Sequence, residues 1–263
     1  MNTFARFSRL CVCGCHWNSW HNLLALMISA ASIALIPKLC VAQETSTPTD
    51  TSASYKFTTG YYSFSSQSAG WDVNLRRSSE LGNIWLGYFG QSDQMISQWR
   101  AGWDNSFGKD IRITPSIQTA SGGFWGGSIQ AEVGDPWFFS LGFGRTNLRP
   151  YFNLNFDPND SYMLSLGKHL SAKDLFAVQY IRDNRENPDQ RHLHLVYKRQ
   201  LNQRDRLSMD LLYKTGLVGG TTIHRWGLSA TYDWPGWFMR VAWDPNVNFS
   251  ADNSLRISTG IRF

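Results

Sequence analysis

Two histidines that alternate on one extended segment have the spacing most suggestive of chemistry. His192 and His194 lie two residues apart, so their side chains share one face of a predicted strand. A turn centred on Asn202 would place Asp210 beside them on the next strand. Two imidazoles and a carboxylate can bind a metal ion, and with Ser208 they could support acyl transfer. We adopt the simpler interpretation of hydrogen-bonded histidines, and we predict no metal ligand, no catalytic residue and no cofactor.

A third histidine keeps an enzymatic alternative open. His224 shares its face with Trp226 and Leu228, which places it among apolar side chains, and no serine stands on that face of its segment. The sequence has no Gly-rich phosphate loop, no His-Glu-x-x-His, no Gly-x-Ser-x-Gly and no acidic calcium loop. An enzyme is therefore the alternative rather than the preferred interpretation.

The N-terminal residues differ in composition from the rest of the chain. Residues 1–42 contain Arg6, Arg9 and Lys38 but no acidic residue, and an uncharged run extends from Leu23 to Ile36. That run is shorter than the roughly 20 residues of a membrane-spanning helix and is typical of a signal peptide. We predict a signal peptide over 1–42, a flexible periplasmic leader rich in Thr and Ser over 43–54, and one domain over 55–263.

Cysteines and charge exclude several classes of function. All four cysteines lie within residues 1–42, so the predicted mature chain has no disulfide and no thiolate site. Loss of the three basic residues of the signal peptide lowers the formal net charge from +5 to +2. A nearly neutral chain does not indicate nucleic-acid binding.

The remainder of the chain alternates apolar and polar residues with a period of two. Trp71, Val73 and Leu75 fall on one face of their segment, and Asp72, Asn74 and Arg76 on the other. Similar alternation occurs over residues 99–104, 148–156, 207–214 and 237–244. Gly, Asn, Asp and Pro interrupt these segments, which is typical of an all-β fold.

About fifteen segments could be strands. Connections at 77–83, 107–110, 170–174 and 201–205 are predicted as short turns on one side, and those at 183–190, 216–221 and 245–253 lie on the other. The two sets disagree by one strand, so either one segment between Gly122 and Phe156 is miscounted or Tyr55–Phe64 is incomplete. We predict fourteen strands, with twelve or sixteen as alternatives.

The last strand indicates which face points outward. Residues 255–263 alternate apolar positions and end in Phe263, and this segment resembles the C-terminal assembly signal of bacterial outer-membrane β-barrels. The resemblance implies that Ile257, Ile261 and Phe263 are recognised by the barrel-assembly machinery. Tryptophans near the ends of apolar stripes suit the two membrane interfaces: Trp71, Trp103, Trp226, Trp237 and Trp243. A Trp-rich, sugar-binding sandwich is the rival explanation, and it leaves the last strand unexplained.

A membrane-spanning sheet must close, because every backbone polar group in hydrocarbon needs a partner within the protein. We therefore expect a closed antiparallel transmembrane β-barrel in the Gram-negative outer membrane. Outer-membrane lipid and lipopolysaccharide would surround a monomer.

With the polar face inward, cations outnumber acids in the lumen. The predicted lumen-lining residues are Arg76, Arg100, Arg112, Arg149, Lys198, Arg206, Asp210, Lys214, Arg225, Arg240 and Arg256. They could form either a packed salt-bridge network or the wall of a channel, and both interpretations stay open. No segment between strands looks long enough for a folded plug, which favours an open conduit.

The preferred function is a porin-like, narrow, passive channel with a cationic lumen for small anionic solutes. The alternatives are an enzyme that modifies lipid or lipopolysaccharide, and a structural or export-associated barrel without channel activity.

Overall fold

Fourteen antiparallel strands form the fold. The structure, a computed structural model, describes residues 54–91, 96–155, 157–187 and 189–263. The strands are β1 Ser54–Phe64, β2 Ala69–Ser79, β3 Gly82–Gln91, β4 Ile96–Asp104, β5 Ile111–Ala120, β6 Phe124–Val133, β7 Trp137–Thr146, β8 Ser161–His169, β9 Asp174–Asp183, β10 Arg191–Gln200, β11 Arg206–Val218, β12 Thr221–Asp233, β13 Trp237–Asp244 and β14 Ser254–Arg262. Two short 3₁₀ helices, η1 Ser121–Gly123 and η2 Val247–Phe249, lie between strands. In the described part of the chain, no helix is long and apolar enough to cross a membrane.

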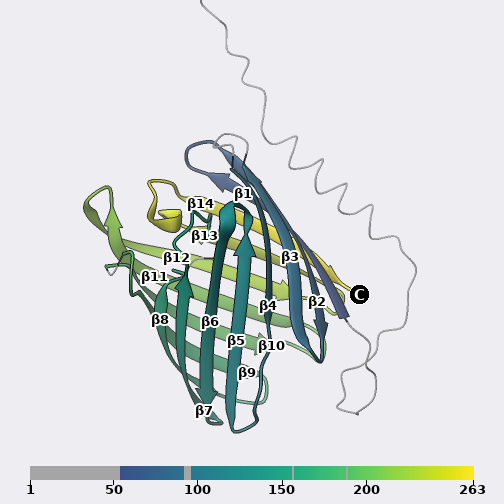
Figure 1. Cartoon of the computed structure of the whole chain (residues 1–263). Helices are drawn as coiled ribbons and strands as arrows, with labels where there is room; N and C mark the ends of the chain where they lie inside the picture. Colours follow the sequence, from purple (N-terminus) through teal and green to yellow (C-terminus); the bar gives the residue numbers. More distant parts are fainter. Residues whose placement is uncertain (1–53, 92–95, 156, 188) are drawn as a thin grey trace, which may run out of the picture. The chain divides into compact units, whose positions relative to one another are not determined.

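The strands form one closed ring (Figure 1). Each strand pairs with its neighbours in the sequence, and β1 pairs with β14 over nine residue pairs, from Lys56 with Arg262 to Phe64 with Ser254. Closure leaves no sheet edge with unpaired backbone groups. The prediction of a closed, fourteen-stranded antiparallel barrel is confirmed. The predicted signal peptide lies outside the described residues, as does the predicted leader up to Ala53; Ser54 begins β1.

The two ends of the barrel differ. Tyr55 and Phe263 exchange backbone hydrogen bonds of 2.7 and 2.9 Å, so the first and last strands meet at one end, which we call the terminal end. Short turns occupy this end, including the predicted ones at 170–174 and 201–205. The opposite end, the loop end, carries the connections between β7 and β8, between β9 and β10 and between β13 and β14.

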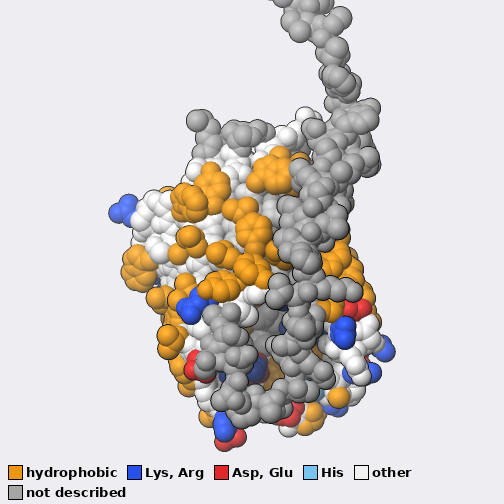
Figure 2. Space-filling model, turned by 90° about the vertical axis from the view of Figure 1, so that its right-hand side faces the viewer, with side chains coloured by type: hydrophobic (Ala, Val, Ile, Leu, Met, Phe, Trp, Pro, Cys, Tyr) orange, Lys and Arg blue, Asp and Glu red, His pale blue; other side chains and the backbone are white. Residues whose placement is uncertain are grey.

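Apolar side chains cover the outside of the barrel and charged ones lie inside. Trp237, Val241 and Leu255 are 43%, 40% and 40% exposed, whereas Lys214 and Asp244 are 1% and 2% exposed. A soluble β-sandwich would show the reverse, because its apolar face looks inward. Figure 2 shows hydrophobic side chains spread over the outer wall. This inversion is what a barrel surrounded by lipid requires.

Tryptophans lie in two bands on the outer wall. Trp71, Trp99, Trp125, Trp226 and Trp243 lie toward the loop end, and Trp103, Trp137 and Trp237 toward the terminal end. Trp237 and Trp243 are six residues apart on one strand, which is about 20 Å at about 3.3 Å per residue. That spacing is close to the roughly 25 Å apolar band of outer-membrane barrels. The contact of these rings with lipid stays a prediction.

One predicted strand is wrong. Residues 147–155 belong to no strand and form part of the connection between β7 and β8. Counting this segment as a strand gave one candidate too many, which is why the two sets of predicted turns disagreed by one strand. Its apolar residues alternate because some of them pack inside the barrel, as Phe152 and Leu154 do.

Candidate functional site

The connection between β7 and β8 folds into the barrel. We call residues 147–155 and 157–160 the lumen loop. The ring of Phe152 stacks on Phe89 of β3, with ring centres 4.8 Å apart and planes 4° apart. Its backbone N–H donates to Oε1 of Gln98 on β4 at 2.8 Å, and Nε2 of Gln98 donates to its carbonyl at 3.0 Å. Leu154 is buried beside Tyr62 and Phe64 of β1. The loop therefore crosses the interior, and the expectation of a conduit without a plugging segment was wrong.

A glycine lets the returning part of the loop lie against the wall. A Cβ atom at Gly144 of β7 would collide with the backbone carbonyl of Asn159. Because glycine has no Cβ, β7 and the loop can approach each other closely. The loop is also joined to the β13–β14 connection, where Asn248 Nδ2 donates to the carbonyl of Asn153 at 2.9 Å. Contacts on several strands thus fix the loop across the lumen.

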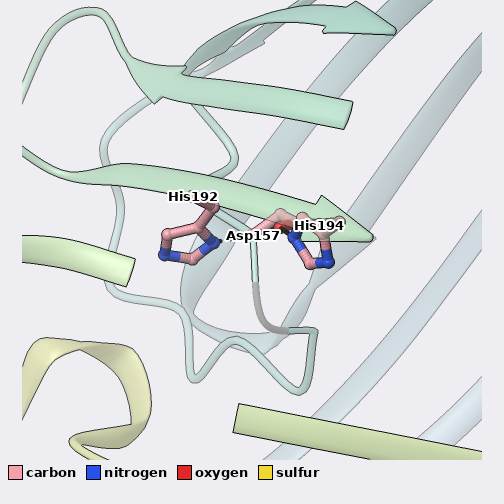
Figure 3. A group of neighbouring side chains, drawn as sticks. All are labelled: Asp157, His192 and His194. Atoms are coloured by element: carbon pink, nitrogen blue, oxygen red, sulfur yellow. Dashed lines mark hydrogen bonds and ion pairs between the residues drawn. The ribbon is translucent and has the colours of Figure 1, made fainter. Parts of the chain in front are cut away.

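Asp157 ties the returning arm of the loop to β10. Its carboxylate lies between the rings of His192 and His194 (Figure 3), with Oδ1 3.0 Å from Nδ1 of His192 and 2.8 Å from Nε2 of His194. Nδ1 of His194 lies 2.9 Å from Oδ1 of Asp210 on β11. Burial alone would raise the pKa of Asp157, but the hydrogen bonds from the two histidines outweigh it and hold that pKa well below its ordinary value.

The sequence pointed to His192, His194 and Asp210, and the structure brings these three residues together around Asp157 and His194. The predicted proximity of Asp210 to the histidines is confirmed for His194. Asp157 was missed, because it was placed just after a supposed strand. The signal that could have found it is the polar run Asp157-Pro158-Asn159-Asp160, which is typical of a loop.

Two sizeable cavities lie against the lumen loop. The inner cavity, of about 410 Å³, lies among β5 to β9, Asp210 and two arginines, Arg240 and Arg256. The outer cavity, of about 450 Å³, opens between the lumen loop and the β9–β10 connection. Both are lined by Thr146, Asp157, Pro158 and Asn159. These four residues therefore form the boundary between the two spaces.

The cavities carry different charges. The outer cavity is lined by Asp157, Asp160, Asp183 and Glu186, with Arg149 as the cation. In the inner cavity Arg240 and Arg256 face Asp157 and Asp210, and Arg145 lies toward its rim. Asp160 is paired with Arg145 at 3.7 Å and with Arg185 at 3.3 Å, so Asp183 and Glu186 are the acids that give the loop-end entrance its negative character. In the inner cavity Arg240 is exposed and Arg256 is partly buried.

Most of the predicted lumen-lining residues lie on inward-facing strand positions, namely Arg76, Arg100, Arg112, Lys198, Arg206, Asp210, Lys214, Arg225, Arg240 and Arg256. Arg149 does not lie on a strand; it belongs to the lumen loop and lines the outer cavity. Two inward-facing acids, Asp183 and Asp233, were missed in the sequence.

Several inward-facing cations are neutralised by acids on the adjacent strand or on the next strand but one. Arg100 pairs with Asp72 at 2.5 Å and Lys214 with Asp244 at 2.5 Å. The other such pairs are Arg76 with Asp104, Arg112 with Glu132, and Arg206 and Arg262 with Asp233. The salt-bridge network and the cavities coexist within the barrel.

The histidines do not form a catalytic arrangement with a serine. His224 faces outward, and its Nδ1 lies 2.9 Å from the hydroxyl of Tyr213. Within the described ranges, no serine hydroxyl is hydrogen-bonded to His192, His194 or His224. Acyl transfer would need such a contact between nucleophile and base.

Comparison with known proteins finds similarity in solved structures alone. No family model and no curated protein sequence matches the chain. The outer membrane protein Omp33 of Acinetobacter baumannii is 7% identical, with a TM-score of 0.49 over 80% of this chain and 97% of that one. The KdgM porin is 10% identical, with a TM-score of 0.42 over 79% and 99%. The NanC porin is 12% identical, with a TM-score of 0.41 over 79% and 98%. All three identities are 12% or lower and all three TM-scores are below 0.5, so the likeness is one of barrel fold alone.

Proposed function

We propose that this protein is a passive outer-membrane channel through which small polar solutes pass beside the lumen loop. The observation that carries the proposal is the pair of cavities that meet at Thr146, Asp157, Pro158 and Asn159. Barrels of about eight strands are filled by side chains and those of sixteen or more enclose wide channels. A fourteen-stranded barrel with one inward loop suits a narrow passage between these extremes.

The outer membrane is the proposed location. Support comes from the apolar outer wall, the two tryptophan bands and the buried charges, an arrangement suited to lipid outside and water inside. Lipid and lipopolysaccharide would contact the wall of a monomer. Ile257, Ile261 and Phe263 would be recognised by the barrel-assembly machinery during insertion.

A weak preference for anions is the proposed selectivity. Arg240 is exposed within the barrel and lines the inner cavity together with Arg256. Guanidinium groups in a water-filled passage attract anions. The acids of the outer cavity oppose this attraction, so the preference is expected to be small.

Electrical recording tests the channel. The full chain, expressed with its N-terminal segment and purified in detergent, would be inserted into planar lipid bilayers. We expect discrete conductance steps, and a reversal potential under a KCl gradient that indicates a slight excess of chloride permeability. Heat-denatured protein is the control. Folded protein that inserts but never conducts would support the structural barrel instead.

A further inference from the structure

Three side chains inside the barrel offer donor atoms that lie close together. Asp157, His192 and His194 each present one ligand atom, and these atoms lie within 4.8 Å of one another. The two histidines are 1% and 3% exposed. Imidazole nitrogen and carboxylate oxygen are ligands that Zn²⁺ and related divalent transition metals accept.

We propose that Asp157, His192 and His194 bind a divalent transition-metal ion of the zinc class, and that the bound ion fastens the lumen loop to β10. The two ligands on β10 come from the wall of the barrel and the third comes from the loop. Binding would therefore join segments that are far apart in the sequence and set the position of the loop's returning arm. The fourth coordination position would be left to water.

The environment of His194 supports this assignment. Its Nδ1 lies 2.9 and 3.0 Å from the two carboxylate oxygens of Asp210, while Nε2 points to Asp157. Histidines that bind metals usually donate their other ring N–H to a carboxylate, which fixes the tautomer and the orientation of the ring. Asp210 would hold Nε2 of His194 ready for a metal ion in this way.

His192 directs one ring nitrogen to the same point. Its Nδ1 lies 3.0 Å from Asp157, and its ring stacks on Phe249 with centres 5.5 Å apart. Among the described residues its Nε2 is buried without a hydrogen-bond partner. Nδ1 is thus the atom through which this ring makes its polar contact, and its partner is Asp157, the proposed ligand from the loop.

Binding would require the three side chains to close around the ion. Ligands at about 2.0–2.1 Å from a tetrahedral metal are roughly 3.3 Å apart. Oδ1 of Asp157 is 3.0 Å from Nδ1 of His192 and 2.8 Å from Nε2 of His194, which are hydrogen-bond distances. The three donor atoms lie within 4.8 Å of one another, so binding would draw them together by up to about 1.5 Å. Asp157 belongs to a connection rather than a strand, and the two imidazole rings can turn about their side-chain bonds, so this closure would not need the barrel ladder to move. Because Asp157 lines both cavities, an ion could arrive from either side.

Zinc titration of the purified full chain in detergent, without a histidine tag, tests the site. We expect wild-type protein to bind one more Zn²⁺ ion than Asp157→Asn or the double variant His192→Gln/His194→Gln. The number of bound ions is compared between wild type and variants because Cys11, Cys13 and Cys15 could bind zinc in unprocessed chains. With Co²⁺ as the probe, the same difference should appear as the visible absorption of a tetrahedral site.

Two further variants separate a built site from incidental histidine binding. Asp210→Asn should weaken Zn²⁺ binding by about 10- to 100-fold, the effect usual for loss of a carboxylate behind a ligating histidine. His169→Gln is the matched control, because His169 also contacts an aspartate, Asp135 at 2.9 Å, but has no second histidine beside it. It should bind Zn²⁺ as the wild type does.

Folding is checked by the heat-dependent gel mobility of the closed barrel. Folded wild-type protein that binds no more Zn²⁺ than folded Asp157→Asn would overturn the proposal, as would equal loss of binding in the His169 variant. None of these measurements uses an electrical current. A barrel that binds zinc without conducting would therefore refute the channel and leave the metal site standing.

Discussion

Arg240 is a cation of the inner cavity that is exposed within the barrel, and its Nε donates a hydrogen bond to Thr231 at 2.9 Å. A unit charge about 10 Å from a passing ion contributes about 0.4 kcal/mol in water. Removing the charge makes entry less favourable for chloride and more favourable for potassium by this amount, so Arg240→Gln should lower the ratio of chloride to potassium permeability by up to about fourfold, measured as a reversal potential under a salt gradient. Arg77→Gln, on an outward-facing position of β2, should leave the ratio unchanged. An identical effect in both variants would contradict a lumenal role for Arg240.

The contacts around the histidines show what sequence reasoning can reach at a single side chain. His192, His194 and Asp210 could be brought together because strands alternate and a short turn sets their register. Asp157 could not, since its contact with His194 joins residues 37 positions apart through a connection whose path no local pattern specifies. Arg149 was misplaced for the same reason.

The lumen loop is held by a small number of contacts, of which the Phe152 side chain is the largest. Phe152→Ala would remove its stacking on Phe89 and its edge contact with Phe64. Truncation of a fully buried Phe typically costs about 3–5 kcal/mol. Phe152 is partly buried, so a smaller loss is expected, and it would fall on docking of the loop rather than on the barrel. We expect a larger and noisier single-channel conductance with unchanged heat-dependent gel mobility.

Leu148→Ala is the control for that experiment, because Leu148 belongs to the same loop but is 47% exposed. Its conductance should match the wild type. If Phe152→Ala conducted as the wild type does, the lumen loop would not limit the current.

Strands were easier to predict than the loop for a physical reason. In each strand the side chains must alternate between lipid and lumen, so the period of two is imposed along the whole barrel. In residues 147–155 a similar pattern arises from packing against Phe89, Tyr62 and Phe64, which are distant in the sequence. Local alternation cannot distinguish these two causes.

Closure of the ring depends on the first and last strands. The ring of Phe263 stacks on Tyr55, with centres 5.7 Å apart, beside the β1–β14 ladder. Phe263→Ala should reduce the amount of folded barrel recovered from cells several-fold, because the terminal aromatic would serve recognition during assembly. Barrel refolded from urea into detergent should form normally, since the nine pairs of the ladder remain.

Phe107→Ala is the matched control, because Phe107 is 52% exposed in a turn at the terminal end. Immunoblots of heated and unheated membrane fractions would report both variants. Equal recovery of the Phe263 variant and the wild type would remove the assembly role inferred from resemblance.

The architecture of the whole molecule could be predicted, and the state of its lumen could not. An apolar exterior, a terminal strand that ends in Phe263 and the backbone's need for partners all point to closure, independently of any single strand. Whether the lumen is open depends on the path of the connection between β7 and β8, which no local pattern in the sequence specifies. The acids of the outer cavity, such as Asp183, change the expected charge of the entrance for the same reason.

The unequal charge of the two cavities makes the barrel electrically asymmetric along its axis. Asp183 and Glu186 line one side of the boundary, while Arg240 and Arg256 line the other. Ions driven in opposite directions would meet these groups in opposite order, so the same voltage of either sign would enrich or deplete mobile ions at the junction. If the proposed channel conducts, its current–voltage curve should bend, and the sense of the bend would report which way round a barrel has entered the bilayer.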